Sequence, residues 1–165
     1  MKIHSLYLVG FMGAGKSTIA RTLAKQTGWQ AEDMDELIES RENRSIASIF
    51  TDEGEAYFRR IEQEVLADLL SKTNIIVATG GGTFIDSGNR EAILSTASAA
   101  WLDLPFNDVI RRIPPDGKRP LANNRIQLEQ LYLRRQPSYQ EAHIRIDSSQ
   151  PVSEVVEQLL TWIDF

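Results

Sequence analysis

Five short stretches, three of them rich in apolar residues, are predicted to be strands. The run NIIVAT at residues 74–79 contains the continuous apolar stretch IIVA, which is typical of a strand covered on both faces. The last stretch, HIRID, alternates between apolar and polar side chains instead. The predicted strands are residues 2–10, 29–33, 74–79, 99–104 and 143–147.

The segments between these strands repeat their apolar residues with the period of a helix. The longest of them, residues 52–72, carries an apolar stripe of Phe58, Ile61, Val65 and Leu69. Glycine and proline mark several ends, and Pro137 is expected to end its helix. The predicted helices are residues 16–28, 35–43, 45–50, 52–72, 86–97, 106–113, 124–137 and 151–163.

Strands and helices therefore alternate throughout, which predicts an α/β fold with a parallel sheet covered on both faces. The 165 residues are expected to form one domain, because they contain no repeat and no linker. The one long polar loop, PPDGKRPLANN at residues 114–124, is a candidate lid.

Composition narrows the classes of function. The chain has no cysteine, which excludes disulfides, thiolate catalysis and cysteine-bound zinc, and it favours the cytoplasm. A net charge of −5 argues against a general nucleic-acid or membrane surface. No apolar run approaches the roughly 20 residues needed to span a bilayer, and the N-terminal segment does not have the pattern of a signal peptide. Arginine outnumbers lysine by 13 to 5, which suits the binding of small anions.

The segment GFMGAGKST fits the phosphate-loop pattern G-x-x-x-x-G-K-[ST], and it lies between a predicted strand and a predicted helix. Gly10, Gly13 and Gly15 let the backbone wrap closely around a phosphate group. Lys16 can reach the β- and γ-phosphates, and the Ser17 hydroxyl can bind Mg²⁺. The motif predicts ATP or GTP binding but does not identify the acceptor.

Two carboxylates and a glycine run follow neighbouring strands. Asp33 and Asp35 point the same way on an extended segment, where they can hold a metal, hold a hydroxyl or do neither. The run TGGG at residues 79–82 ends a buried strand, and its N–H groups can approach a ligand closely. Both features fall at the carboxyl ends of strands, where α/β sheets bind ligands. Three glycines are more than a turn requires, although a simple tight turn is the alternative explanation.

Three arginines are candidates for anion binding, and each also has a structural explanation. Arg59 is spaced for ion pairs with Glu55 and Glu62 on the same helix. Arg119 in the candidate lid can close on the γ-phosphate or simply be solvated. Arg135 can complement the helix dipole just before Pro137. Together they suggest a small acceptor with a carboxylate.

In this order, the motifs GFMGAGKST, DMDELIE, FRRIE, TGGG, RPL and R-x-P-x-Y resemble shikimate kinase, one of the nucleoside-monophosphate-kinase-like P-loop proteins. The resemblance spans roughly residues 5–163. It implies a three-layer α/β/α fold with a five-stranded parallel sheet in the order 2-3-1-4-5. It also implies an acceptor-binding region at about residues 33–61 and a lid at about residues 112–124. Ser138 departs from the usual R-x-P-L-Y, which affects packing more than chemistry.

The resemblance implies transfer of the ATP γ-phosphoryl group to the 3-hydroxyl of shikimate, with Mg²⁺ as cofactor, by a monomer that binds neither nucleic acid nor membrane. Asp35 would hold the ring hydroxyls and accept the proton, Arg59 and Arg135 would clamp the carboxylate, and Glu62 would orient Arg59. Arg112 would lie against adenine. The motif and the resemblance together imply catalysis by Lys16, Asp35 and Arg119; ATP binding by Gly13, Ala14, Gly15, Lys16, Ser17, Thr18, Arg112 and Arg119; shikimate binding by Asp35, Arg59, Gly81 and Arg135; and Mg²⁺ binding by Ser17 and Asp33.

Two other functions fit parts of the sequence. One is a different small-molecule kinase on this fold, such as a gluconate or nucleotide kinase; no base-binding site for a nucleotide acceptor is evident. The other is an inactive relative that serves as a binding module. The presence of Lys16, Asp35 and Arg119 argues against the second.

Overall fold

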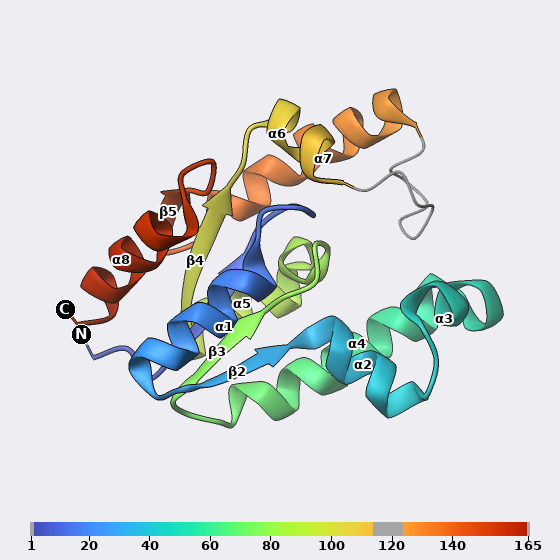
Figure 1. The fold of residues 1–165 in the computed structure, drawn as a ribbon. Helices are drawn as coiled ribbons and strands as arrows, with labels where there is room; N and C mark the ends of the chain where they lie inside the picture. Colours follow the sequence, from blue (N-terminus) through green and yellow to red (C-terminus); the bar gives the residue numbers. More distant parts are fainter. Residues whose placement is uncertain (1, 114–123, 165) are drawn as a thin grey trace.

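The computed structural model describes residues 2–113 and 124–164. At its centre is a five-stranded parallel sheet in the order β2-β3-β1-β4-β5 (Figure 1), which confirms the order implied by the resemblance. The strands are β1 (Ser5–Val9), β2 (Gln30–Asp33), β3 (Ile75–Ala78), β4 (Ser98–Asp103) and β5 (Ile144–Asp147).

Helices cover both faces of this sheet, as predicted. Helices α1 and α8 pack against each other over one face, while α4 and α5 pack together over the other (Figure 1). None of the helices in the described part of the chain has the length and apolar character that crossing a membrane requires. The helices are α1 (Lys16–Thr27), α2 (Met34–Glu42), α3 (Ile46–Glu53), α4 (Glu55–Leu70), the 3₁₀ turn η1 (Thr83–Ile85), α5 (Ser87–Thr96), α6 (Phe106–Arg112), α7 (Arg125–Tyr139) and α8 (Val152–Ile163).

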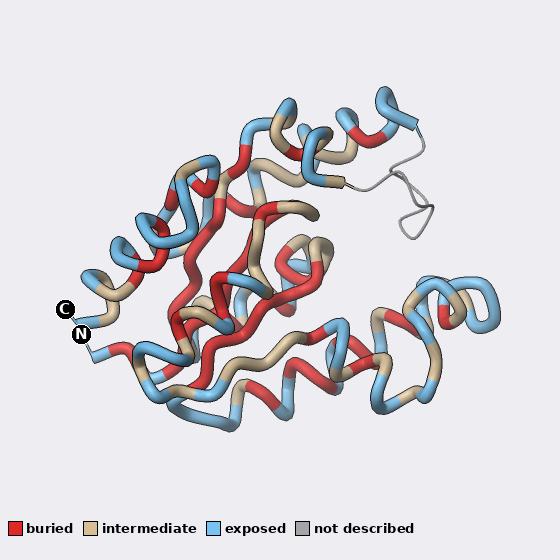
Figure 2. Tube along the Cα trace, in the orientation of Figure 1, coloured by how far each residue is buried: buried red, intermediate tan, exposed pale blue. Residues whose placement is uncertain are grey.

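The central strands form the core. Every residue of β1 and of β3 is buried, and Figure 2 shows both strands buried along their whole length. Strand β1 lies between β3 and β4, with Leu8 in register with Ala78 on one side and Ala100 on the other. Because all the strands are parallel, their carboxyl ends meet at one edge of the sheet, and the loops that follow them are brought together there.

The break predicted between the helices at residues 45–50 and 52–72 lies at Gly54 instead. Helix α3 extends to Glu53, and α4 begins at Glu55. Gly54 between them has φ 85°, a left-handed conformation that an α-helix does not contain, so the chain turns there. The apolar stripe on α4 is confirmed, since all four of its predicted members are buried.

The expectation that Pro137 ends its helix is wrong. Helix α7 runs through Pro137 to Tyr139, although proline has no N–H to donate to the preceding turn. A hydrogen bond and a buried side chain hold the last residues of α7 in place. The N–H of Gln140 donates to the Gln136 carbonyl at 3.1 Å, and the Tyr139 side chain is fully buried.

Tyr7 on β1 supplies a test of the core. Its ring is fully buried, and its hydroxyl has no hydrogen-bond partner among the described residues. Burial also raises the pKa of Tyr7. Because an unpaired buried hydroxyl destabilises the folded state, we expect Tyr7→Phe to raise the free energy of unfolding by about 1 kcal/mol.

Urea denaturation measures this difference directly. Tyr132→Phe is the matched control, because the Tyr132 hydroxyl donates to the Leu104 carbonyl at 2.8 Å, and its loss should lower stability. A Tyr7→Phe variant less stable than the wild type would contradict the interpretation of Tyr7 as an unpaired group.

Candidate functional site

The phosphate loop joins β1 to α1. Gly13 and Gly15 have φ of 81° and 90°, left-handed values that glycine adopts without strain. Lys16 folds back over the loop, and its Nζ donates to the carbonyls of Gly10 at 2.5 Å and Phe11 at 3.1 Å. Helix α1 begins at Lys16 behind Gly15, which brings no side chain to the first N–H groups of the helix. The loop therefore presents backbone N–H groups and a cation at one place, the arrangement that binds phosphate.

Asp33 links this loop to the next strand. The Ser17 hydroxyl donates to Asp33 Oδ2, and Asp33 Oδ1 accepts the Glu36 N–H at 3.2 Å as the N-cap of α2. Over residues 2–113 and 124–164, no three His, Asp or Glu side chains are grouped as a metal site. Two oxygen ligands beside a phosphate loop still suit Mg²⁺, which is usually held by one or two protein groups together with substrate phosphates and water.

The glycine run after β3 lies against two of the predicted acceptor residues. A Cβ placed on Gly80 would lie 3.1 Å from Asp35 Oδ1. A Cβ placed on Gly82 would lie 2.6 Å from Arg59 Nη2. Neither glycine has a positive φ, so the backbone conformation does not require glycine at either position. The neighbouring side chains favour it instead, because they leave little room for a Cβ atom.

The middle glycine lies against the third acceptor residue. A Cβ on Gly81 would lie 3.1 Å from Arg135 Nη1 and 3.9 Å from the backbone nitrogen of Met12 in the phosphate loop. The Arg135 guanidinium also lies over the Phe11 ring, 5.7 Å from its centroid. Asp35, Arg59 and Arg135 thus meet along one short glycine segment that adjoins the phosphate loop.

Arg59 is held by a buried carboxylate. Its Nη1 lies 2.9 Å from Oε1 of Glu62, a residue only 1% exposed, and its Nε lies 3.6 Å from Glu55 Oε1. The other Glu62 oxygen, Oε2, accepts the Thr83 hydroxyl at 2.8 Å. The ion pairs expected from helix spacing are therefore confirmed, and they fix Arg59 against the glycine segment. Thr83 was not singled out in the sequence, where it is only the residue after TGGG.

Arg112 lies against the phosphate loop. Its guanidinium donates to the Gly13 carbonyl at 3.2 Å and to the Ser148 carbonyl at 3.0 Å. It borders a pocket of about 250 Å³ between the phosphate loop and the start of α8. The residues lining this pocket are Gly13, Ala14, Gly15, Thr18, Ile19, Arg112, Ser148, Gln150, Val152 and Val155.

The predicted lid cannot be placed in the same way. Arg119 lies outside the described residues, as does the predicted lid except for its ends at residues 112–113 and 124. The proposed contact of Arg119 with the transferring phosphoryl group stays a prediction. The described part of the site therefore consists of the phosphate loop, the Ser17–Asp33 pair, the acceptor residues at the glycine segment and the Arg112 pocket.

Comparison with known proteins identifies the family of this chain. The family model described as shikimate kinase matches residues 12–164. A shikimate kinase of Persephonella marina is 39% identical over 147 residues, which cover 88% of this chain and 90% of that protein. The structure of shikimate kinase from Acinetobacter baumannii in complex with shikimate aligns with a TM-score of 0.92 at 36% identity, over 98% of this chain and 93% of that one. The shikimate kinase of Aquifex aeolicus aligns with a TM-score of 0.89 at 34% identity, over 97% and 96%. This chain belongs to the shikimate kinase family.

Proposed function

We propose that this protein transfers the γ-phosphoryl group of ATP to the 3-hydroxyl of shikimate, releasing ADP and shikimate 3-phosphate. One observation carries the proposal. Two arginines and an aspartate meet at a glycine segment that lies beside the phosphate loop. Shikimate has one carboxylate and three ring hydroxyls, so two cations and one anion match its groups.

The acceptor residues divide the recognition of shikimate between them. Arg59 and Arg135 bind the carboxylate, and the Gly81 N–H adds a backbone donor. Asp35 accepts hydrogen bonds from the ring hydroxyls on the other side of the segment. Glu62 keeps Arg59 extended toward the substrate. One carboxylate oxygen of Glu62 binds Arg59, and the other accepts the Thr83 hydroxyl, which holds the carboxylate in place. The acceptor-binding region of about residues 33–61 supplies two of these groups, while the glycine segment and α7 supply the others.

The nucleotide lies across the phosphate loop and the Arg112 pocket. Lys16 and Arg119 stabilise the charge of the transferring phosphoryl group, and Arg112 lies against adenine. Ser17 and Asp33 would hold Mg²⁺, which would neutralise charge on the phosphates when bound. The remaining nucleotide contacts come from Gly13, Ala14, Gly15 and Thr18, which lie in the phosphate loop or at the start of α1.

The reaction is an in-line displacement. The 3-hydroxyl oxygen forms a bond to the γ-phosphorus as the bond from that phosphorus to the β–γ bridging oxygen breaks, and Asp35 accepts the hydroxyl proton. Catalysis comes from positioning and from electrostatic stabilisation, since this transfer needs no covalent enzyme intermediate. We take the protein to act as a cytoplasmic monomer of a single domain.

A coupled assay of ADP release tests the proposal. ATP and Mg²⁺ are supplied with shikimate, with gluconate or with each common nucleoside monophosphate, and also without an acceptor. We expect ADP release only when shikimate is the acceptor. Turnover with gluconate or a nucleotide, but not with shikimate, would identify a different acceptor. ATP binding without turnover of any tested acceptor would favour a binding module.

A further inference from the structure

Tyr139, the last residue of α7, connects that helix to the acceptor segment. Its side chain is fully buried, and its hydroxyl donates to the Gly81 carbonyl at 2.6 Å. Tyr139 lies about one helical turn after Arg135, which approaches the same glycine from α7. One helix therefore contacts Gly81 twice, once through a guanidinium and once through a phenol.

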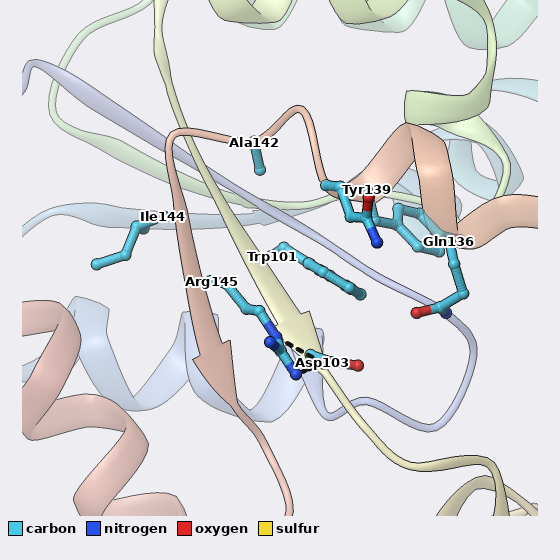
Figure 3. Close-up of a pocket in the computed structure, with 8 residues that line it drawn as sticks. Trp101, Asp103, Gln136, Tyr139, Ala142, Ile144 and Arg145 are labelled. Carbon is cyan, nitrogen blue, oxygen red and sulfur yellow. Dashed lines mark hydrogen bonds and ion pairs between the residues drawn. The ribbon is translucent and has the colours of Figure 1, made fainter.

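The ring of Tyr139 is held by its surroundings. It stacks on Trp101 of β4, with ring centroids 6.1 Å apart and an interplanar angle of 29°. Figure 3 shows the two rings side by side in a pocket of about 310 Å³, which also adjoins the ion pair of Arg145 and Asp103. Burial raises the pKa of Tyr139 to about 12, so the hydroxyl stays protonated and remains a donor near neutral pH.

The hydrogen bond matters because of the residue that accepts it. Gly81 has no side chain to restrict its backbone, and it lies between two other glycines. The bond to its carbonyl fixes the plane of the peptide joining Gly81 to Gly82. That peptide borders both Arg135 and Arg59, the two proposed ligands of the carboxylate.

We propose that Tyr139 is a positioning residue for the acceptor. Its hydroxyl orders the glycine segment so that the Gly81 backbone and the Arg59 and Arg135 side chains reach shikimate together. This inference rests on the proposed function. Tyr139 acts through the glycine segment and through Arg135, which lies beside its hydroxyl, and its effect belongs to shikimate binding and not to ATP binding.

The test compares two tyrosines of α7. Tyr139→Phe removes the bond to Gly81 and keeps the ring, and we expect it to raise KM for shikimate about tenfold, as loss of a buried hydrogen bond can do. KM for ATP should stay within about twofold of the wild type on the same reasoning. Tyr132→Phe is the control, since it loses an equivalent bond to a carbonyl, that of Leu104, which lies outside the glycine segment. It should leave both KM values unchanged.

Each outcome decides the matter. Equal shikimate KM values in the two variants, measured with their melting temperatures, would overturn the positioning role. If Tyr139→Phe does not fold, Trp101→Phe is the second test, because it loosens the packing of the Tyr139 ring and keeps the Tyr139 hydroxyl. It should raise KM for shikimate but not KM for ATP, and an unchanged KM for shikimate would overturn the proposal. A wild type that does not turn over shikimate would remove the proposed function and this inference together, whereas failure of the variants alone would remove only the inference.

Discussion

Replacing Asp35 with asparagine is expected to lower kcat for phosphoryl transfer by about 10²- to 10⁴-fold, the usual contribution of a general base. Asparagine keeps the size of the side chain but does not accept the hydroxyl proton. Asp35 lies in the first turn of α2 beside Gly80, and it does not line the nucleotide pocket. KM for ATP should therefore change by no more than about twofold, because the variant leaves the ATP contacts intact.

Steady-state kinetics with each substrate varied in turn measures both quantities. Glu36→Gln is the matched control, because Glu36 is the next acid in the same helical turn and its side chain is 71% exposed. Its nearest cation is Arg21 at 3.9 Å, and its loss should leave kcat unchanged. Retained turnover in Asp35→Asn with a loss of ATP affinity would assign Asp35 to the nucleotide instead.

Gly82→Ala is expected to weaken shikimate binding strongly while leaving the fold intact. The new Cβ would lie 2.6 Å from Arg59 Nη2 and 2.9 Å from Nη1. The flexible end of the arginine side chain moves more easily than the backbone, so the stability cost should stay near 1 kcal/mol. Because a displaced guanidinium no longer pairs with the carboxylate, we expect KM for shikimate to rise about 30-fold or more.

Thermal unfolding and kinetics together separate these effects. Gly88→Ala serves as the control in an exposed turn of α5, where the nearest atom to the new Cβ is Asp86 Oδ1 at 3.2 Å. Alanine is the better helix former there, so stability should hold or rise and both KM values should stay the same. An unchanged KM for shikimate in Gly82→Ala would show that the Arg59 position is not needed for binding.

The strands and the phosphate loop could be predicted because their signals are local. The run at residues 74–79 has an unbroken apolar centre, and the phosphate loop contains its own glycines, lysine and serine. Helix boundaries have weaker local signals. A single glycine such as Gly54 is tolerated inside many helices, and Pro137 stays helical because a distant contact anchors the residue two positions later.

The acceptor site was predictable only in its parts. Arg59 and Arg135 each had a local explanation, and for Arg59 the expected ion pairs exist beside the contact with the glycine segment. What the sequence could not show is which side chain lies against which glycine. Tyr139 and Gly81 are 58 positions apart, and their contact depends on how α7 packs beside the sheet.

The position of β1 at the centre of the sheet has a consequence for synthesis of the chain. Ser5 pairs with Ile75 and Leu6 with Ser98, so β1 leaves the ribosome before either neighbouring strand and has no partner until those later residues have been made. Until then its apolar residues and unpaired backbone groups are open to other chains. Long-range parallel pairing also slows folding. The strand that ends in the phosphate loop is therefore the segment of the nascent chain most in need of protection from aggregation.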